Sequence, residues 1–300
     1  MTTKPPILRK PEWLKSSLSS TQHYGMTSGT IIGAGLNTIC ASGKCPNRSE
    51  CWSRGTATFM IGGATCTRAC RFCATAFSKT PPPLDPLEPE RIATGVHRMG
   101  LSHAVITSVD RDDLPDGGAE HWRRTILAIR RLSPATRIEV LIPDFDGRPE
   151  LLDVVLSADP DIVGHNLETV RRLTPQVRYR ATYDRSLAVL AYIHRAGFVC
   201  KTGIMVGLGE TAEEVHSLFA DCLASGVSTL TIGQYLQPSH KHAAVVEYLH
   251  PDQFGAYKEV GEAMGLVHIE SGPLVRSSYH ADAQFSQAKR HLDLKELLRH

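Results

Sequence analysis

From residue 58 onward, short apolar runs alternate with longer segments in which apolar residues recur every three or four positions. The short runs predict β-strands and the longer segments predict amphipathic helices. We expect strands at 58–61, 104–109, 138–142, 161–165, 200–206 and 229–234. We expect helices at 89–99, 119–132, 149–157, 185–195 and 211–224. Strand–helix alternation of this kind is typical of parallel βαβ units, and about six of them predict an α/β fold that is a partial TIM-like (β/α)6 barrel.

The two ends of the chain differ from this repeating part. Residues 1–55 show little periodicity and contain scattered Ser, Gly and Pro. The C-terminal part predicts a helix at 251–264, a short strand at 267–269 and a polar helix after residue 280. We therefore divide the chain into an N-terminal extension (1–55), a barrel (56–250) and a C-terminal extension (251–300).

Composition narrows the possible partners. The 300 residues are 42% apolar and 21% charged, as in an ordinary globular protein, and the net charge is +2. A charge so close to zero gives no reason to expect a nucleic-acid partner. No apolar run reaches the length of a membrane span or of a secretory leader, so we expect no membrane partner.

Six of the eight cysteines form two triplets. Cys40, Cys45 and Cys51 have the spacing C-x4-C-x5-C, whereas Cys66, Cys70 and Cys73 have the spacing C-x3-C-x2-C. Closely spaced thiols in a reducing cytoplasm are more typical of metal binding than of disulfides. Three thiolates can hold three irons of a four-iron cluster, leaving one iron without a cysteine ligand.

The second triplet directly follows the first predicted strand, so it belongs at the C-terminal mouth of a barrel, where active sites form. An iron without a cysteine ligand there is a site for S-adenosylmethionine, whose one-electron reduction gives a carbon radical. The alternative is a structural zinc site, but zinc requires four ligands and no fourth ligand is nearby in the sequence.

Other segments leave alternatives open. The run DRDDLPDGG at 110–118 has the aspartates of a calcium loop, but its twelfth position is His121 rather than glutamate, so these residues alone favour a solvated turn. The run GLGETA at 207–212 matches a loose dinucleotide fingerprint without the later acidic residue, and we reject a nicotinamide site. Cys200 and Cys222 belong to neither triplet, and we interpret them as small buried hydrophobic residues.

The run C-T-R-A-C-R-F-C at 66–73 resembles the signature of radical S-adenosylmethionine enzymes. More widely, residues 10–281 resemble the lipoyl synthase family in the segments KPEWLK, CPNRSECW, TATFMI, ITSVDRDDLPDGGA, GHNLETV, TYDRSL, MVGLGET, TIGQYLQPS and RSSYHA. The resemblance implies a sulfurtransferase that inserts sulfur at C6 and C8 of a protein-bound octanoyl-lysine. It also implies two 4Fe-4S clusters and S-adenosylmethionine as cofactors.

The resemblance assigns roles to individual residues. Cys66, Cys70 and Cys73 would hold the cluster that cleaves S-adenosylmethionine. An auxiliary cluster that supplies sulfur would be held by Cys40, Cys45, Cys51 and Ser278. The S-adenosylmethionine or substrate pocket would be lined by Thr107, Ser108, Asp110, Asn166, Glu168, Arg180 and Lys201. For the last four, a helix cap or an ordinary salt bridge is the competing interpretation.

The resemblance also implies partners. These are octanoylated lipoyl-carrier proteins (the E2 subunits of 2-oxoacid dehydrogenases and the glycine cleavage H protein), an electron donor such as ferredoxin or flavodoxin, and an iron–sulfur carrier for cluster rebuilding. Rival functions fit less well. Methylthiotransferases carry their extra cysteines on a separate domain, but only 65 residues precede Cys66. Biotin synthases place the auxiliary ligands within the barrel. A zinc-ribbon or electron-carrier module needs no βα scaffold.

Overall fold

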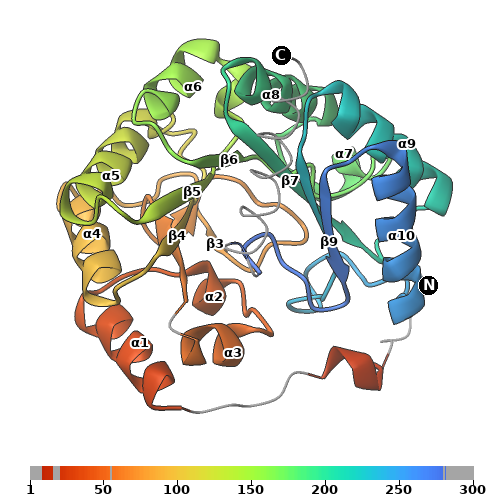
Figure 1. Ribbon diagram of the computed structural model, residues 1–300, viewed down its shortest axis with the longest axis horizontal. Coiled ribbons are helices and arrows are strands. Elements are labelled where there is room, and N and C mark those ends of the chain that lie inside the picture. The colour runs from red at the N-terminus through yellow and green to blue at the C-terminus, as the bar shows by residue number, and fades with distance from the viewer. Residues whose placement is uncertain (1–8, 16–20, 55, 280, 282–300) are drawn as a thin grey trace, which may run out of the picture.

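Seven parallel strands form one curved sheet in the computed structural model, which describes residues 9–15, 21–54, 56–279 and 281 (Figure 1). The strands pair in the order of the chain: β1 (Thr58–Ile61), β4 (His103–Ser108), β5 (Arg137–Leu141), β6 (Ile162–Gly164), β7 (Val199–Val206), β8 (Thr229–Gln234) and β9 (His268–Gly272). The strands β1 and β9 are the two edges of the sheet. The architecture is therefore a partial barrel, which confirms the predicted fold class.

Six helices cover the outer face of this sheet (Figure 1): α4 (Glu88–Arg98), α5 (Ala119–Leu132), α6 (Pro149–Leu156), α8 (Tyr183–Arg195), α9 (Ala212–Ala224) and α10 (Pro251–Met264). Each lays an apolar stripe on the strands, as Ile92 and Val96 of α4 do beside Phe59 of β1 in the main core. The helix α9 begins where a capping box between Thr211 and Glu214 satisfies its free amide groups. None of the helices described is both long and apolar enough to cross a bilayer.

All six predicted strands are present, with small shifts at their ends. The predicted strand at 267–269 is longer than expected and pairs with β8, so the C-terminal extension adds a seventh strand to the sheet. The predicted helix after residue 280 lies outside the described residues. The remaining elements were not expected: η1 (Glu12–Leu14), α1 (Gln22–Gly33), α2 (Ile39–Ser42), α3 (Arg48–Ser53), η2 (Phe145–Gly147), α7 (Thr174–Val177) and the small pair β2 (Thr65–Cys66) and β3 (Ala76–Phe77).

The N-terminal extension occupies the opening between the two edge strands. Thr38 bridges antiparallel to Phe59 of β1, and the amide of Met60 donates to Asn37 O at 2.9 Å. On the other side, Asn47 Nδ2 donates to Leu274 O, just after β9, at 2.7 Å. Figure 1 accordingly shows α2 and α3 in the gap of the ring. The helices that carry the first cysteines therefore form part of the barrel wall.

Candidate functional site: two thiol loops around one chamber

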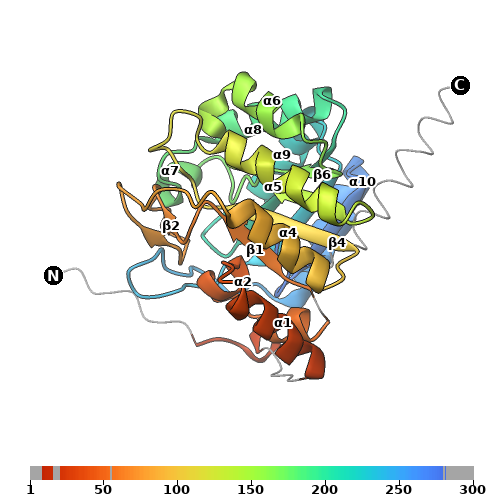
Figure 2. The ribbon, with the colours of Figure 1, turned by 90° about the vertical axis from the view of Figure 1, so that its left-hand side faces the viewer.

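The second thiol loop, residues 66–73, begins at the C-terminal end of β1. Gly62 and Gly63 make the turn out of the strand with φ of 82° and 94°, a conformation that favours glycine. The buried carboxylate of Glu88 accepts hydrogen bonds from both glycine amides, at 2.7 and 3.4 Å. Further along, the amide of Arg71 donates to Val177 O at the end of α7, which lies beside β2 in Figure 2. The loop is thus fixed at both ends.

Arg68, inside this loop, anchors it to the mouth of the barrel. Its guanidinium lies 2.7 Å from Asp112, 2.8 Å from Asp144 and 3.2 Å from Asp110. Burial would lower the pKa of Arg68, but the carboxylates more than offset this effect and raise it. The same guanidinium holds the pKa of Asp144 at about 2 against the opposing effect of burial. A buried network of this kind fixes the loop, because removing one partner would leave the other charges buried without compensation.

The three thiols of the second loop border a cavity of about 160 Å³. Burial raises the pKa of Cys66 to about 12, helped by the carboxylate of Asp110, and raises the pKa of Cys70 to about 11. All six loop cysteines are free of disulfides. Buried thiols of high pKa become thiolates only when a cation compensates their charge, and soft sulfur donors suit iron–sulfur clusters. This donor set would therefore suit an iron–sulfur cluster held beside the cavity.

The structure places five of the seven predicted pocket residues around this cavity: Thr107, Ser108, Asp110, Asn166 and Glu168. Asp110 lies closest to the loop, since its amide donates to Cys66 Sγ at 3.3 Å. Burial raises the pKa of Asp110 to about 6, partly against the effect of Arg68. Glu168 is half-buried, its pKa is raised by desolvation, and its φ of 69° is a strained value typical of functional sites.

Arg180 and Lys201 differ from the prediction, because neither lines the cavities around the cysteine loops in the described structure. Arg180 is half exposed and forms a bidentate pair with Asp146 at 2.6 and 2.9 Å. Lys201 faces the barrel interior and donates to Glu139 at 2.7 Å. Each cation is already held by a carboxylate, which corrects the expectation that they meet a methionyl group.

The first thiol loop, residues 40–51, is built from the short helices α2 and α3. Thr38 caps α2 by accepting a hydrogen bond from Ala41 N at 3.3 Å, and this cap places Cys40 in the first turn. The amide of Cys45 donates back to Cys40 O at 3.2 Å. Burial raises the pKa of Cys51 to about 12, with Cys40 and Cys45 as the next causes. The three thiols therefore lie close enough to interact.

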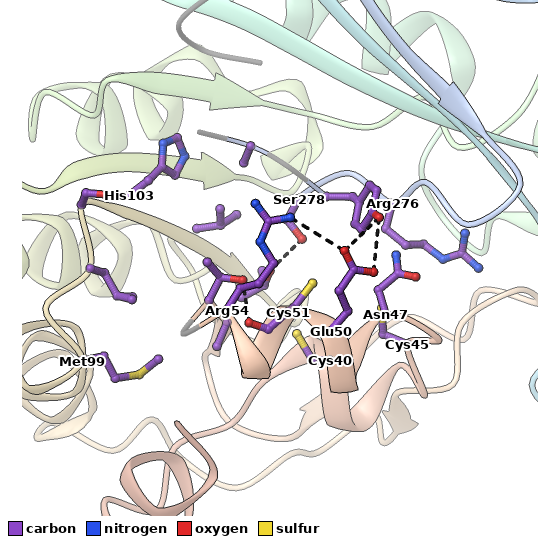
Figure 3. Close-up of a pocket in the computed structure, with 18 of the residues that line it drawn as sticks. Cys40, Cys45, Asn47, Glu50, Cys51, Arg54, Met99, His103, Arg276 and Ser278 are labelled. Atoms are coloured by element: carbon purple, nitrogen blue, oxygen red, sulfur yellow. Dashed lines mark hydrogen bonds and ion pairs between the residues drawn. The ribbon is translucent and has the colours of Figure 1, made fainter. Parts of the chain in front are cut away.

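These thiols border a second cavity, of about 360 Å³, which also contains Ser278 (Figure 3). The serine comes from the segment after β9, more than two hundred residues from the first loop. Thr58, at the start of β1, donates a hydrogen bond to Ser278 Oγ at 2.7 Å. Tyr279 next to it donates to the carboxylate of Glu50 on α3. The C-terminal extension thus brings a hydroxyl oxygen to the three thiols.

A third cavity, of about 470 Å³, occupies the barrel between the two loops. It is bordered by Lys44 and Pro46 of the first loop, by Phe72 and Cys73 of the second loop, and by Arg276. Ile39, next to Cys40, packs against a cluster that contains Cys66. The two thiol sets are therefore not on remote faces of the molecule.

Several side chains of this site were not identified from the sequence. Arg276 borders both the central chamber and the cavity of the first loop, and burial lowers its pKa. Arg68 and Arg276 both lie inside segments that carried the resemblance, C-T-R-A-C and R-S-S-Y, which was the available signal. His165 likewise lies in the matching segment G-H-N-L-E-T-V, whereas Asp144 gave no such signal. Within the described residues no three His, Cys, Asp or Glu side chains converge on a single metal ion. An iron–sulfur cluster does not require such convergence, because each of its protein ligands binds a different iron atom.

Comparison with known proteins agrees with this geometry. The family model of the Radical SAM superfamily matches residues 60–222. The chain is 58% identical over 276 residues to a lipoyl synthase of Porphyromonas gingivalis, covering 92% of this chain and 98% of that protein. It is 52% identical over 274 residues to a lipoyl synthase of Treponema denticola, covering 91% and 94% of the two chains.

Solved structures show the same fold at low sequence identity. Streptococcus suis SuiB bound to S-adenosylmethionine has a TM-score of 0.53 at 12% identity, with 73% of this chain and 51% of that chain covered. HydG, a maturase of the [FeFe]-hydrogenase, has a TM-score of 0.53 at 13% identity, with 77% and 62% covered. The sequence identity over nearly the whole length decides the assignment: this chain belongs to the lipoyl synthase family of the radical SAM superfamily.

Proposed function

We propose that this chain is a lipoyl synthase, a sulfurtransferase that converts an octanoyl-lysine on a carrier protein to lipoyl-lysine by inserting sulfur at C6 and C8. The observation that supports the proposal is that both thiol loops border one barrel chamber and that Ser278 lines the same cavity as the thiols of the first loop. One triplet alone would support radical formation but would leave the sulfur without a source.

The second loop would hold a 4Fe-4S cluster through Cys66, Cys70 and Cys73. When bound, this cluster and S-adenosylmethionine supply a 5′-deoxyadenosyl radical that abstracts hydrogen from the substrate. The chain's own role is to fix the loop through Arg68 and to surround the cavity with the donors and acceptors of Thr107, Asp110 and Asn166. A preorganised cavity of this kind orients the cofactor and excludes water.

The first loop would hold an auxiliary 4Fe-4S cluster through Cys40, Cys45, Cys51 and Ser278. An oxygen ligand on a soft cluster binds less tightly than a thiolate, so the Ser278 corner is the one suited to open. Thr58 supports this role, because its hydroxyl donates to Ser278 Oγ and would stabilise that oxygen when it carries negative charge. We infer that this cluster provides the two sulfur atoms.

The central chamber would receive the octanoyl chain. Its wall carries apolar side chains from opposite sides, including Ile39, Phe72, Ile204 and Leu236. An eight-carbon acyl chain is apolar and flexible, so a preformed apolar wall lowers the entropy lost when its reacting carbons are held in place. The chamber lies between the two loops, as a substrate must if a radical is made on one side and sulfur is added on the other.

The proposal implies partners of defined chemistry. The acyl group reaches the chain on a lipoyl-carrier protein, namely an E2 subunit of a 2-oxoacid dehydrogenase or the glycine cleavage H protein. A low-potential donor such as ferredoxin or flavodoxin supplies electrons, and an iron–sulfur carrier rebuilds the first loop's cluster. We place the reaction in the cytoplasm, since six closely spaced free thiols suit a reducing compartment.

The test is to incubate the anaerobically purified, cluster-loaded chain with an octanoylated carrier peptide, S-adenosylmethionine and a low-potential reductant. We expect about eight irons per chain and a peptide that gains two sulfur atoms. A peptide of unchanged mass, despite cleavage of S-adenosylmethionine, would contradict the proposed function.

A further inference from the structure

Two exposed aromatic rings lie side by side next to the second thiol loop. Phe77, on β3, is 45% exposed, and Tyr179, just after α7, is 54% exposed. Their ring centroids are 6.1 Å apart, so the two rings form one apolar patch. Neither ring borders the cavities of the two thiol loops or the central chamber. Large rings left in solvent in this way are typical of a surface that contacts a partner.

The backbone joins each ring to a thiol of the second loop. In the strand pair β2–β3, Phe77 lies in register with Cys66, and Ser78 N donates to Cys66 O at 3.0 Å. Burial raises the pKa of Cys70 to about 11, and the backbone amide of Tyr179 opposes this effect by donating a hydrogen bond to the thiol. Figure 2 shows β2 beside α7 at the edge of the molecule. The aromatic patch is therefore built on two of the three thiols of this loop.

Two exposed cations flank this patch in the chain. Arg71 lies within the loop, and its guanidinium donates to Gln176 O at 3.4 Å. Lys79 lies two residues after Phe77. Neither cation forms an ion pair with a residue that the structure describes. We call the surface formed by Arg71, Phe77, Lys79 and Tyr179 the outer face. Its apolar centre beside uncompensated positive charge suits a partner with an acidic surface.

The proposed function requires one electron for each cleavage of S-adenosylmethionine. The donor loses this electron, and the sulfonium gains it as a carbon–sulfur bond breaks to give methionine and the 5′-deoxyadenosyl radical. The cavity on the inner side of the second loop measures about 160 Å³, which excludes a protein. A protein donor must therefore approach this loop from the outside.

We infer that the outer face is the docking surface for an acidic, low-potential one-electron carrier protein; the inference rests on the proposed function. Electron-transfer complexes are weak and bury less than about 1,200 Å², so a small surface is sufficient. The two rings supply its apolar centre, and Arg71 and Lys79 supply its cationic rim. The acyl-carrier protein fits this face less well, because none of its four residues borders the central chamber that would receive the octanoyl chain.

The first test measures cleavage of S-adenosylmethionine by the cluster-loaded chain with two reductants. One is a reduced flavodoxin with an acidic surface, and the other is dithionite, which is too small to need a docking surface. Because a favourable field speeds association by about 10-fold or more, we expect Lys79→Glu to raise the KM for flavodoxin at least about five-fold at low salt. This difference should shrink at about 1 M salt, where charges are screened within ~3 Å. Cleavage driven by dithionite should stay within about two-fold of wild type.

A second variant, Phe77→Thr/Tyr179→Thr, removes both rings. Threonine suits a strand, so the pairing of β3 with Cys66 is kept. Aromatic side chains at the centre of an interface carry much of its binding energy, and we expect the KM for flavodoxin to rise at least about 10-fold. The matched controls are Arg98→Glu, an exposed cation at the end of α4, and Ile32→Thr, a residue of α1 that is 74% exposed. Both controls should behave as wild type with both reductants.

Binding of oxidised flavodoxin to the immobilised, cluster-loaded chain gives a readout that does not depend on turnover. Its Kd should rise in both variants of the outer face and in neither control. Wild-type KM and Kd in both variants would overturn the inference while leaving the proposed function intact.

Two further outcomes would also overturn the inference. Equal losses with flavodoxin and with dithionite would show that the outer face supports the loop itself. A rise in KM for the octanoylated carrier peptide alone would assign this face to the acyl carrier. A wild-type chain that fails to cleave S-adenosylmethionine even with dithionite would instead overturn the proposed function.

Discussion

The two thiol loops differ in what holds them. The second loop is fixed by Arg68, whose guanidinium binds three aspartates at the mouth of the barrel, and by Glu88 beneath its first turn. The first loop rests on two short helices and on the segment after β9, where Tyr279 donates to Glu50 and Leu274 O accepts from Asn47. A rigid loop with an open corner suits repeated cofactor cleavage. Under the proposed function, a first loop whose fourth ligand is the Ser278 oxygen would suit a cluster that is consumed.

The largest expected effect comes from removing a single thiol from one loop or from the other. Cys66→Ala should reduce cleavage of S-adenosylmethionine more than about 100-fold, because even indirect support of a metal is worth 10–100-fold. Cys40→Ala should leave that cleavage within about two-fold but abolish sulfur addition. Measuring 5′-deoxyadenosine and peptide mass in the same reactions separates the two. Loss of cleavage in both variants would mean that the loops do not act separately.

The next largest effect tests the anchor of the second loop. Arg68→Leu leaves Asp144 and its neighbours buried without their cation, so we expect the free energy of unfolding to fall by about 3–5 kcal/mol. Urea unfolding followed by circular dichroism measures this loss. Arg131→Ala removes an exposed pair with Glu90 and should cost less than about 1 kcal/mol. Similar losses in both variants would show that Arg68 is not a special anchor.

Acidification should weaken the surroundings of the second loop. His165 borders its cavity and bonds Ile142 O and Ser186, and burial lowers its pKa to about 4, with Arg178 as the next cause. A lowered histidine pKa gives stability that is present above about pH 6.5 and is lost as the pH falls toward 4, up to about 3 kcal/mol. Urea unfolding between pH 7 and 4.5 measures this. His165→Gln should flatten that part of the profile, and an equally steep profile would rule out His165 as its source.

A smaller effect is expected where the first loop meets the C-terminal extension. Ser278→Ala removes the oxygen but keeps three thiols, so we expect roughly a 10-fold loss of sulfur addition, comparable to the loss of one stabilising group. Cleavage of S-adenosylmethionine should remain. The readouts are peptide mass and iron content per chain. Wild-type sulfur addition by this variant would remove Ser278 from the ligand set.

Much of the fold could be predicted from local pattern. The six predicted strands follow from apolar runs, and α9 follows from its capping box, because both depend on neighbouring residues. The helix α1 was missed because Gly25, Gly29 and Gly33 interrupt it and no apolar stripe marks it. The seventh strand was underestimated because its pairing with β8 depends on the path of the whole chain.

In the site, too, features set by neighbouring residues could be predicted and features set by distant residues could not. Cysteine spacing is local and could be interpreted from the sequence, but the meeting of Thr58 and Ser278 joins residues 220 positions apart. Lys201 was misplaced for a related reason. Its partner Glu139 lies on another strand, and a lysine paired inside a barrel cannot be distinguished in sequence from one that awaits a ligand.

The most direct test of the central claim follows the sulfur atoms. The chain is reconstituted with sulfide of a heavy isotope, freed of unbound sulfide, and incubated with octanoylated carrier peptide, S-adenosylmethionine and reductant, beside a Cys40→Ala/Cys45→Ala/Cys51→Ala variant. We predict heavy sulfur at both positions of the wild-type product and none in the variant, which still cleaves S-adenosylmethionine. Sulfur addition by the variant, or light sulfur in the wild-type product, would contradict the account.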